Sequence, residues 1–366
     1  MKNTFGNALT LTLFGESHGA AVGAVLDGIT PGLPVDEGEI GAMLSRRRPQ
    51  SGLDTARREP DHFRIVSGVF EGKTTGTPLC ILIPNEDTRS EDYTRGVARP
   101  SHADFAAYCK YHGFEDYRGG GHFSGRVTAA LVAVGGLLLP ALRACGVEIG
   151  THILSLGGTE DARFSPDPAE ELALLSARDF PTLSPEAGER MKAAILAAKA
   201  EGDSVGGCTE TAVIGFPAGV GEPFFDTVEG VIARAMFSVG GVKGVDFGLG
   251  FGFAEGRASA CNDAFRVKNG KIVTETNRSG GVNGGISNGM PVVFRCAVRP
   301  TPTIATEQET VDFRSGKNTV LSGKGRHDPA IVRRICPVID SLTALVLCDF
   351  LIGRFGTDAL LERGFR

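Results

Sequence analysis

Two neighbouring residues near the start of the chain could each do chemistry. Residues 15–19 read Gly-Glu-Ser-His-Gly, which fits the G-x-S-x-G pattern of a hydrolase nucleophile elbow and places His18 beside Ser17. An elbow needs a helix directly after the turn, whereas residues 20–27 have the pattern of a second strand. An acid–base histidine at position 18 is therefore favoured, and a serine hydrolase that uses Ser17 stays open as an alternative.

Three further histidines stand in polar settings like that of His18. His102 lies in RPSHAD, His122 in RGGGHFSG and His327 in GRHDP. An ordinary imidazole titrates near pH ~6.5, so it can donate a proton and recover it at cellular pH. These positions are candidate acids or bases.

Arginines and glycines are grouped in a way that predicts anion binding. Residues 46–58 hold five arginines and one aspartate in a chain with a net charge of −5. Guanidinium groups match carboxylates and phosphates in geometry as well as charge. Glycine-rich runs at 119–125, 240–244 and 280–285 offer clustered backbone N–H groups, although none fits the usual dinucleotide or ATP loop patterns. Together these features predict a site for two anionic molecules.

Composition narrows the class of protein. With 42% hydrophobic and 22% charged residues, the 366-residue chain has the composition of a globular protein, and its acidic balance argues against nucleic acid or a membrane surface as partner. The eight cysteines show neither a C-x-x-C pair nor zinc-site spacing, so no metal site is predicted. Four lie in apolar stretches, where buried reduced thiols are expected: Cys80, Cys145, Cys296 and Cys348. The first residues lack the layout of a signal peptide, so we expect a cytoplasmic protein. Glycines and a proline interrupt the apolar run at 127–142, so we expect no membrane span there.

The elements that must position these residues follow from the hydrophobic pattern. It predicts strands at 8–14, 20–27, 63–70, 79–83, 147–157 and 292–298. It predicts a helix capped by Asp36, further helices at 103–111, from near Ser124, at 186–200 and 226–237, and a last one at 329–355 with a kink at Pro337. Residues 159–185 are expected to form a loop. Helices and strands do not alternate regularly, which favours an α+β architecture, and no linker divides the chain, so we expect one domain over residues 1–366.

Ten motifs occur in order over nearly the whole chain. They are FGESHG, RRRP, RREPD, SGVFEGKTTGTP, RPSHADF, YRGGGHFSGR, GDSVGG, VKGVDFG, GGISNGMP and GRHDP. In this combination the sequence resembles the chorismate synthase family. The resemblance implies a single-domain β-α-β sandwich, with helices between antiparallel sheets, that assembles into a homotetramer. It also implies a lyase that removes phosphate and a ring proton from 5-enolpyruvylshikimate-3-phosphate by anti 1,4-elimination, dependent on reduced FMN, with NADPH as a candidate reductant.

The resemblance also implies residue roles. His18 would protonate the departing phosphate, His102 would protonate the reduced flavin, and Asp328 would be the carboxylate that works with flavin N5. Substrate contacts fall on Ser17, Arg48, Arg99 and Arg126. Flavin contacts fall on His122, Phe123, Ser124, Gly240, Gly241, Gly284, Arg299, Pro300, Thr301, Pro302, Thr303 and Arg326. An inactive flavin-binding or polyanion-binding homologue is a second alternative, and the presence of all three proton-transfer residues argues against it.

The chain departs from the family pattern at a few positions. The family usually reads RRRPG followed by a basic residue, whereas this chain reads RRRPQ with Leu53 near the basic position. One anion or nicotinamide contact is affected. Ser101 stands in place of the glycine of the commoner RPGH, and His122 stands where many members carry arginine. Gly240 and Gly241 replace an Asn-Ala or Pro-Ala pair. None of these changes removes a proposed proton-transfer group.

Overall fold

Two five-stranded antiparallel sheets form the outer layers of the protein. The computed structural model describes residues 2–49, 51–55, 59–88, 93–322 and 328–361. The first sheet has the order β1 (Thr4–Phe5), β2 (Thr10–Gly15), β3 (Ala21–Asp27), β7 (Leu79–Pro84) and β4 (Arg64–Ser67). The second has the order β11 (Val242–Phe247), β16 (Val292–Val298), β10 (Gly207–Ile214), β8 (Glu148–Leu156) and β9 (Thr159–Glu160).

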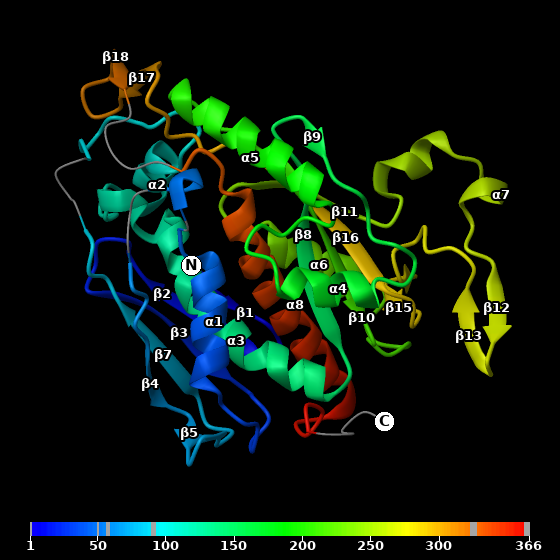
Figure 1. Ribbon diagram of the computed structural model, residues 1–366. Coiled ribbons are helices and arrows are strands. Elements are labelled where there is room, and N and C mark those ends of the chain that lie inside the picture. The colour runs from blue at the N-terminus through cyan, green and yellow to red at the C-terminus, as the bar shows by residue number, and fades with distance from the viewer. Residues whose placement is uncertain (1, 50, 56–58, 89–92, 323–327, 362–366) are drawn as a thin grey trace.

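Three helices fill the space between the sheets: α1 (Glu37–Arg47), α3 (Thr128–Ala144) and α8 (Val332–Phe355). Helix α3 packs on β3 and β7 of the first sheet, α8 packs on β8 and β10 of the second, and α3 contacts both α1 and α8 (Figure 1). Alternate residues of β7 are buried, as expected for a strand with one face on a core. The β-α-β sandwich is therefore confirmed.

Two glycines in α3 explain how three helices fit into one layer. A Cβ atom at Gly135 would lie 2.0 Å from Ser341 Oγ of α8, and one at Gly136 would lie 2.6 Å from the Cα atom of Ile40 in α1. Glycine therefore allows close approach on both flanks of α3, although it weakens an isolated helix. The helical segment 125–144 and α8 are long and apolar enough to cross a membrane, but 78% and 94% of their most apolar windows are buried in this core.

Smaller elements surround the sandwich. The helices are α2 (Asp104–Tyr111), α4 (Ala169–Ser176), α5 (Pro185–Ala200), α6 (Val228–Met236) and α7 (Ala258–Cys261). The hairpins are β5 (Val69–Phe70) with β6 (Lys73–Thr74), β12 (Phe265–Lys268) with β13 (Lys271–Thr274), β14 (Val282–Asn283) with β15 (Ile286–Ser287), and β17 (Glu307–Asp312) with β18 (Lys317–Ser322). The β12–β13 hairpin extends away from the main body (Figure 1).

Most predicted elements are confirmed, and the exceptions have physical causes. Asp36 caps α1 as expected, because its Oδ1 accepts from the backbone N–H groups of Gly38 and Glu39 at 2.7 and 3.4 Å. The predicted loop 159–185 is wrong, since it contains β9 and α4. The predicted strand 63–70 is divided at Gly68, where φ is +86°. Helix α8 begins at Val332 and continues through Pro337, and Cys80 is only half-buried.

Candidate active site

The turn that carries Ser17 and His18 joins two antiparallel strands. It connects β2 to β3, and the Ser17 backbone N–H donates to the Gly121 carbonyl at 3.0 Å. A nucleophile elbow requires a strand followed by a helix, so the elbow interpretation is wrong and the serine hydrolase alternative loses its support. Ser17 is fully buried, which further separates it from the exposed serine of an elbow.

Three successive glycines bring the two candidate acids together. Gly119, Gly120 and Gly121 have φ values of +60°, +81° and +53°, a path open mainly to glycine. A Cβ atom at Gly119 would lie 2.5 Å from both Cδ2 and Nε2 of His18, and one at Gly120 would lie 3.1 Å from Cε1 and 3.2 Å from Nε2 of His102. Because successive Cα atoms are about 3.8 Å apart, the two imidazoles lie against neighbouring residues of one loop.

His102 is held by an ion pair on its own segment. Its Nδ1 lies 2.8 Å from Asp104 Oδ1 and 3.0 Å from Arg99 Nη2. Arg99 also donates to both Asp104 oxygens, from Nε at 2.8 Å and from Nη2 at 2.6 Å. Burial alone would raise the pKa of Asp104, but the hydrogen bonds and charges of Arg99 and His102 outweigh it and hold that pKa well below its usual range. Asp104 is therefore an ionised carboxylate.

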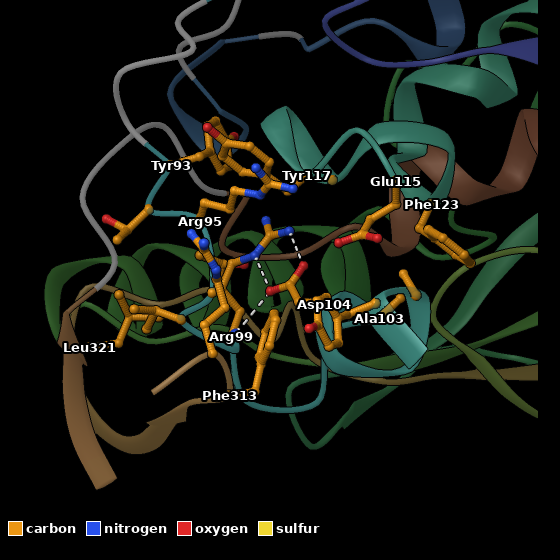
Figure 2. Close-up of a pocket in the computed structure, with 18 of the residues that line it drawn as sticks. Tyr93, Arg95, Arg99, Ala103, Asp104, Glu115, Tyr117, Phe123, Phe313 and Leu321 are labelled. Carbon is orange, nitrogen blue, oxygen red and sulfur yellow. Dashed lines mark hydrogen bonds and ion pairs between the residues drawn. The ribbon is translucent and has the colours of Figure 1, made fainter. Parts of the chain in front are cut away.

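A cavity of about 310 Å³ opens beside this ion pair (Figure 2). Its size is at the lower end of ordinary small-molecule sites. Its lining includes Arg95, Arg99, Glu115, Gly120 and Thr303, and its aromatic walls are Tyr93, Tyr108, Tyr117, Phe123 and Phe313.

Tyr93 links the two histidine environments at the cavity. Arg99 lies over the Tyr93 ring at 5.4 Å, and that ring meets the His18 ring edge-on at 5.5 Å. Of the aromatic and acidic lining only Phe123 was predicted from the sequence, because the other residues carry no pattern that assigns them to a site. For Asp104 a signal was available in the R-x-x-H-x-D spacing.

A second group of charged residues forms where α1 ends and α8 begins. Arg334 Nε donates to the Arg47 carbonyl at 2.9 Å, and Arg334 Nη1 pairs with Asp328. Asp328 Oδ1 also accepts from the Thr55 backbone N–H at 2.8 Å. Burial lowers the pKa of Arg47 to about 10. The nearby positive charges of Arg334 and Arg126 also lower this pKa, whereas the pairing with Asp61 raises it. Asp328 is thus part of this arginine group, and the described lining of the 310 Å³ cavity does not include it.

Two arginines predicted to bind substrate have different surroundings. The Arg126 side chain is only 2% exposed and points into a buried cluster, where it pairs with Asp61 and donates to Asn85 Oδ1 and the Pro84 carbonyl, each at 2.9 Å. Arg126 thus makes structural contacts in the described part of the chain, and its predicted substrate contact stays a prediction. Arg48 donates from Nη1 to the Pro60 carbonyl at 3.1 Å, while its buried Nε has no hydrogen-bond partner within the part of the chain that the structure describes. The predicted substrate contact at Arg48 stays a prediction.

Two of the predicted flavin contacts line the cavity, and several others lie on the same segments as these two. Phe123 and Thr303 line it, and His122 Nδ1 lies 2.9 Å from the Gly15 carbonyl oxygen. Ser124 caps the following helical turn, with its Oγ accepting from the Arg126 backbone N–H at 3.3 Å. Arg299 joins two parts of the site, because its backbone N–H donates to the Gly241 carbonyl at 2.9 Å and its Nη1 donates to the Ser101 carbonyl at 2.5 Å.

The remaining predicted flavin contacts divide into three groups. Pro300, Thr301 and Pro302 continue the segment after Arg299, and a Cβ atom at Gly240 would lie 4.0 Å from the Phe123 carbonyl oxygen. Gly284 lies in the β14–β15 turn and does not line this cavity. Its neighbour Gly285 lies against Thr227, the residue before α6, whereas Gly240 follows the C-terminal end of α6. Arg326, like His327, lies outside the described residues.

The site residues fit a ligand with a planar aromatic part and polar or anionic groups. Among the described residues, buried polar atoms without a hydrogen-bond partner occur at Arg299 Nε, Thr301 Oγ1 and Glu115 Oε2. Native proteins rarely leave such atoms unsatisfied, so a bound water or ligand is expected to meet them. The aromatic walls offer surfaces for a ring system. Within the described residues, no group of three or more His, Cys, Asp or Glu side chains is placed to hold a metal ion.

Comparisons with known proteins agree on one family. A family model described as chorismate synthase matches residues 9–352. Curated relatives named chorismate synthase include one from Aeropyrum pernix, 45% identical with 96% of this chain and 93% of the relative covered. Another from Pyrococcus abyssi is 45% identical, with 95% and 97% covered. A solved structure titled "Crystal Structure of Chorismate Synthase" has a TM-score of 0.77 at 30% identity, covering 99% of this chain and 97% of that one.

Proposed function

The chain belongs to the chorismate synthase family, and from this premise we propose that it converts 5-enolpyruvylshikimate-3-phosphate to chorismate with reduced FMN. The observation that carries the proposal is the convergence of His18 and His102 on Gly119 and Gly120, beside a cavity with arginine and aromatic walls. A substrate with a phosphate and two carboxylates needs arginine partners, and the chain concentrates arginines around this site.

Reduced FMN, when bound, supplies transient electron donation that assists departure of the phosphate. The residues that would hold it are the cavity-lining Phe123 and Thr303, together with Arg299 and Thr301, whose unpartnered polar atoms can meet its polar groups. The aromatic walls and unpartnered donors support this assignment over a purely anionic ligand.

His18 serves as the acid for the departing phosphate. The neighbouring Asp116 carboxylate is held ionised mainly by its hydrogen bond from Arg118, and its interaction with His18 also lowers the Asp116 pKa. His18 would supply the proton that the phosphate needs on leaving.

The other two candidate proton-transfer residues belong to different groups of side chains: His102 lies against Gly120 of the cavity lining, and Asp328 lies in the arginine group where α1 ends and α8 begins. His102 turns Nε2 toward Gly120, which lines the cavity, and can hold a proton there. Asp328 accepts one hydrogen bond on each carboxylate oxygen, from Thr55 and Arg334. Each oxygen keeps a further lone pair, so Asp328 can still accept the proton that leaves the substrate ring.

The test is an anaerobic assay with chemically reduced FMN that follows both chorismate formation and phosphate release. His18→Ala should lose about 10²–10⁴ in turnover, the usual contribution of a positioned acid. Ser17→Ala removes one hydroxyl and should lose on the order of fivefold, equivalent to about 1 kcal/mol. Absence of chorismate with the wild-type protein would refute the function. An inactive Ser17→Ala beside a fully active His18→Ala would refute the assignment of the acid.

Three further features remain part of the proposal. We propose a homotetramer, supported by Phe224, Phe225 and Phe251, which are 85%, 96% and 86% exposed in the single chain. Exposed aromatic side chains in such number are typical of surfaces that bind a partner. Light scattering would measure the assembly.

A cytoplasmic location and NADPH as reductant are proposed on family grounds. Turnover with NADPH as sole reductant, compared with turnover with dithionite, tests the choice of reductant.

A further inference from the structure

We propose that Asp104 is the positioning residue for His102: its carboxylate accepts the Nδ1–H of the imidazole and thereby directs Nε2 toward Gly120, a residue that lines the cavity. The inference rests on the proposed function for the step that it serves. The geometry behind it stands independently, because the Nδ1 to Oδ1 distance is 2.8 Å and Nε2 lies on the Gly120 side of the ring.

The contacts of His102 decide which ring nitrogen carries the proton. Nδ1 lies within hydrogen-bond distance of both Asp104 Oδ1 and Arg99 Nη2. A guanidinium can only donate and an ionised carboxylate can only accept. If Nδ1 accepted from Arg99, its lone pair would face a carboxylate oxygen at 2.8 Å. If Nδ1 donates to Asp104, it forms a charge-assisted bond, and Arg99 Nη2 already has an acceptor in Asp104 Oδ1 at 2.6 Å. The Nδ1–H tautomer is therefore the consistent one.

Asp104 is itself held firmly. It is the first residue of α2, where a carboxylate interacts favourably with the helix dipole. Its Oδ2 accepts from both the backbone N–H and the Nε of Arg99, at 2.9 and 2.8 Å. The Asp104 and Arg99 side chains are 15% and 13% exposed. The carboxylate cannot turn away from His102 without breaking these bonds, so it can fix the orientation of the ring.

The decisive variant is Asp104→Asn, and the chain offers a matched control. An asparagine has one acceptor oxygen where Arg99 and His102 use two, so at least one of these contacts is lost. Asp246 forms the same forked pair with Arg295, at 2.8 and 2.6 Å, and is 24% exposed on the second sheet. Asp246→Asn therefore reproduces the loss of an ion pair away from the cavity.

The experiment measures tautomer and turnover separately. Solid-state ¹⁵N spectra of histidine-labelled protein at alkaline pH, with His102 assigned through its loss in His102→Gln, should show the Nδ1–H form in the wild type and in Asp246→Asn. Asp104→Asn should shift His102 toward the Nε2–H form. It should also lower kcat by about 10², the cost of a misplaced catalytic group, with KM changed less than about threefold. Asp104→Glu, which restores the charge, should recover part of the lost kcat.

Two results would overturn the inference. One is an Nε2–H tautomer for His102 in the wild-type protein, which needs no variant to fold. The other is a kcat of Asp104→Asn equal to that of Asp246→Asn. If the wild-type protein makes no chorismate, the proposed function fails, and the tautomer measurement alone then decides whether Asp104 positions His102.

Discussion

The contact between Gly119 and His18 can be tested with a single methyl group. In Gly119→Ala the new Cβ would lie 2.5 Å from Cδ2 and Nε2 of His18 and 2.9 Å from Ser17 Oγ. Ordinary van der Waals contact begins at 3.4 Å, so the imidazole must move by about 1 Å. A displacement of that size at a catalytic group costs about 10² in rate. We therefore expect turnover to fall by two orders of magnitude.

The backbone contribution must be separated from this displacement. Gly119 has φ +60°, where a residue with a Cβ is disfavoured by roughly 1–2 kcal/mol, offset by about 0.4–1 kcal/mol because the unfolded chain loses freedom. Gly72, in the β5–β6 turn, has φ +71°, and nothing lies within 4 Å of the position that a Cβ atom would take there. Gly72→Ala should thus lose a similar amount of stability, about 1 kcal/mol, and keep wild-type turnover.

The assay combines denaturant unfolding of both variants with anaerobic chorismate formation. If Gly119→Ala turns over within threefold of Gly72→Ala, His18 either adapts without loss or is not the acid. Either result would refute the argument that the glycine run positions the imidazole. A loss of activity explained fully by unfolding of Gly119→Ala would appear as an equal loss of folded protein in the denaturant curves.

Two further predictions concern stability. Asp61→Asn leaves two buried arginines without their shared carboxylate and should lower the free energy of unfolding in urea by about 3–5 kcal/mol. Because those arginines outweigh burial and lower the Asp61 pKa below 3.8, the stabilisation by Asp61 should be present above about pH 4 and decline as the pH falls through the folded-state pKa. Equal acid sensitivity of the wild type and the variant would contradict the pairing. Ser101→Gly should leave turnover unchanged and raise the free energy of unfolding by up to about 1 kcal/mol, because Ser101 has φ +59° at an exposed turn position that favours glycine. A destabilised variant would show that the serine side chain has a role of its own.

The sequence was most informative where local chemistry decides the structure. The Asp36 cap depends on backbone N–H groups two and three residues away, and it was predicted correctly. The strands Gly207–Ile214 and Val242–Phe247 were missed, because partners from distant parts of the chain stabilise them. The hairpin β17–β18 alternates half-buried with exposed residues, which gives only a weak hydrophobic signal.

Arg126 shows why site assignment from sequence has a limit. Its place in the YRGGGHFSGR motif identifies an important arginine but not what it contacts. The counterion, Asp61, is 65 residues away and is brought in by the fold. A buried arginine paired with a carboxylate and a surface arginine facing a ligand have the same sequence signature. Only the arrangement of elements separates them.

The site depends on both sheets, and the helix layer sets the distance between them. Ser17 and His18 follow a strand of the first sheet, whereas Arg299 follows β16 of the second and reaches the His102 segment through the Ser101 carbonyl. The glycine run lies between these two groups and continues through Ser124 into α3. The loop that contacts both imidazoles is therefore the direct extension of a core helix whose own glycines fix its approach to α1 and α8. A packing change at that helix would move the loop, so the close contacts in α3 contribute to the placement of His18 and His102 as well as to stability.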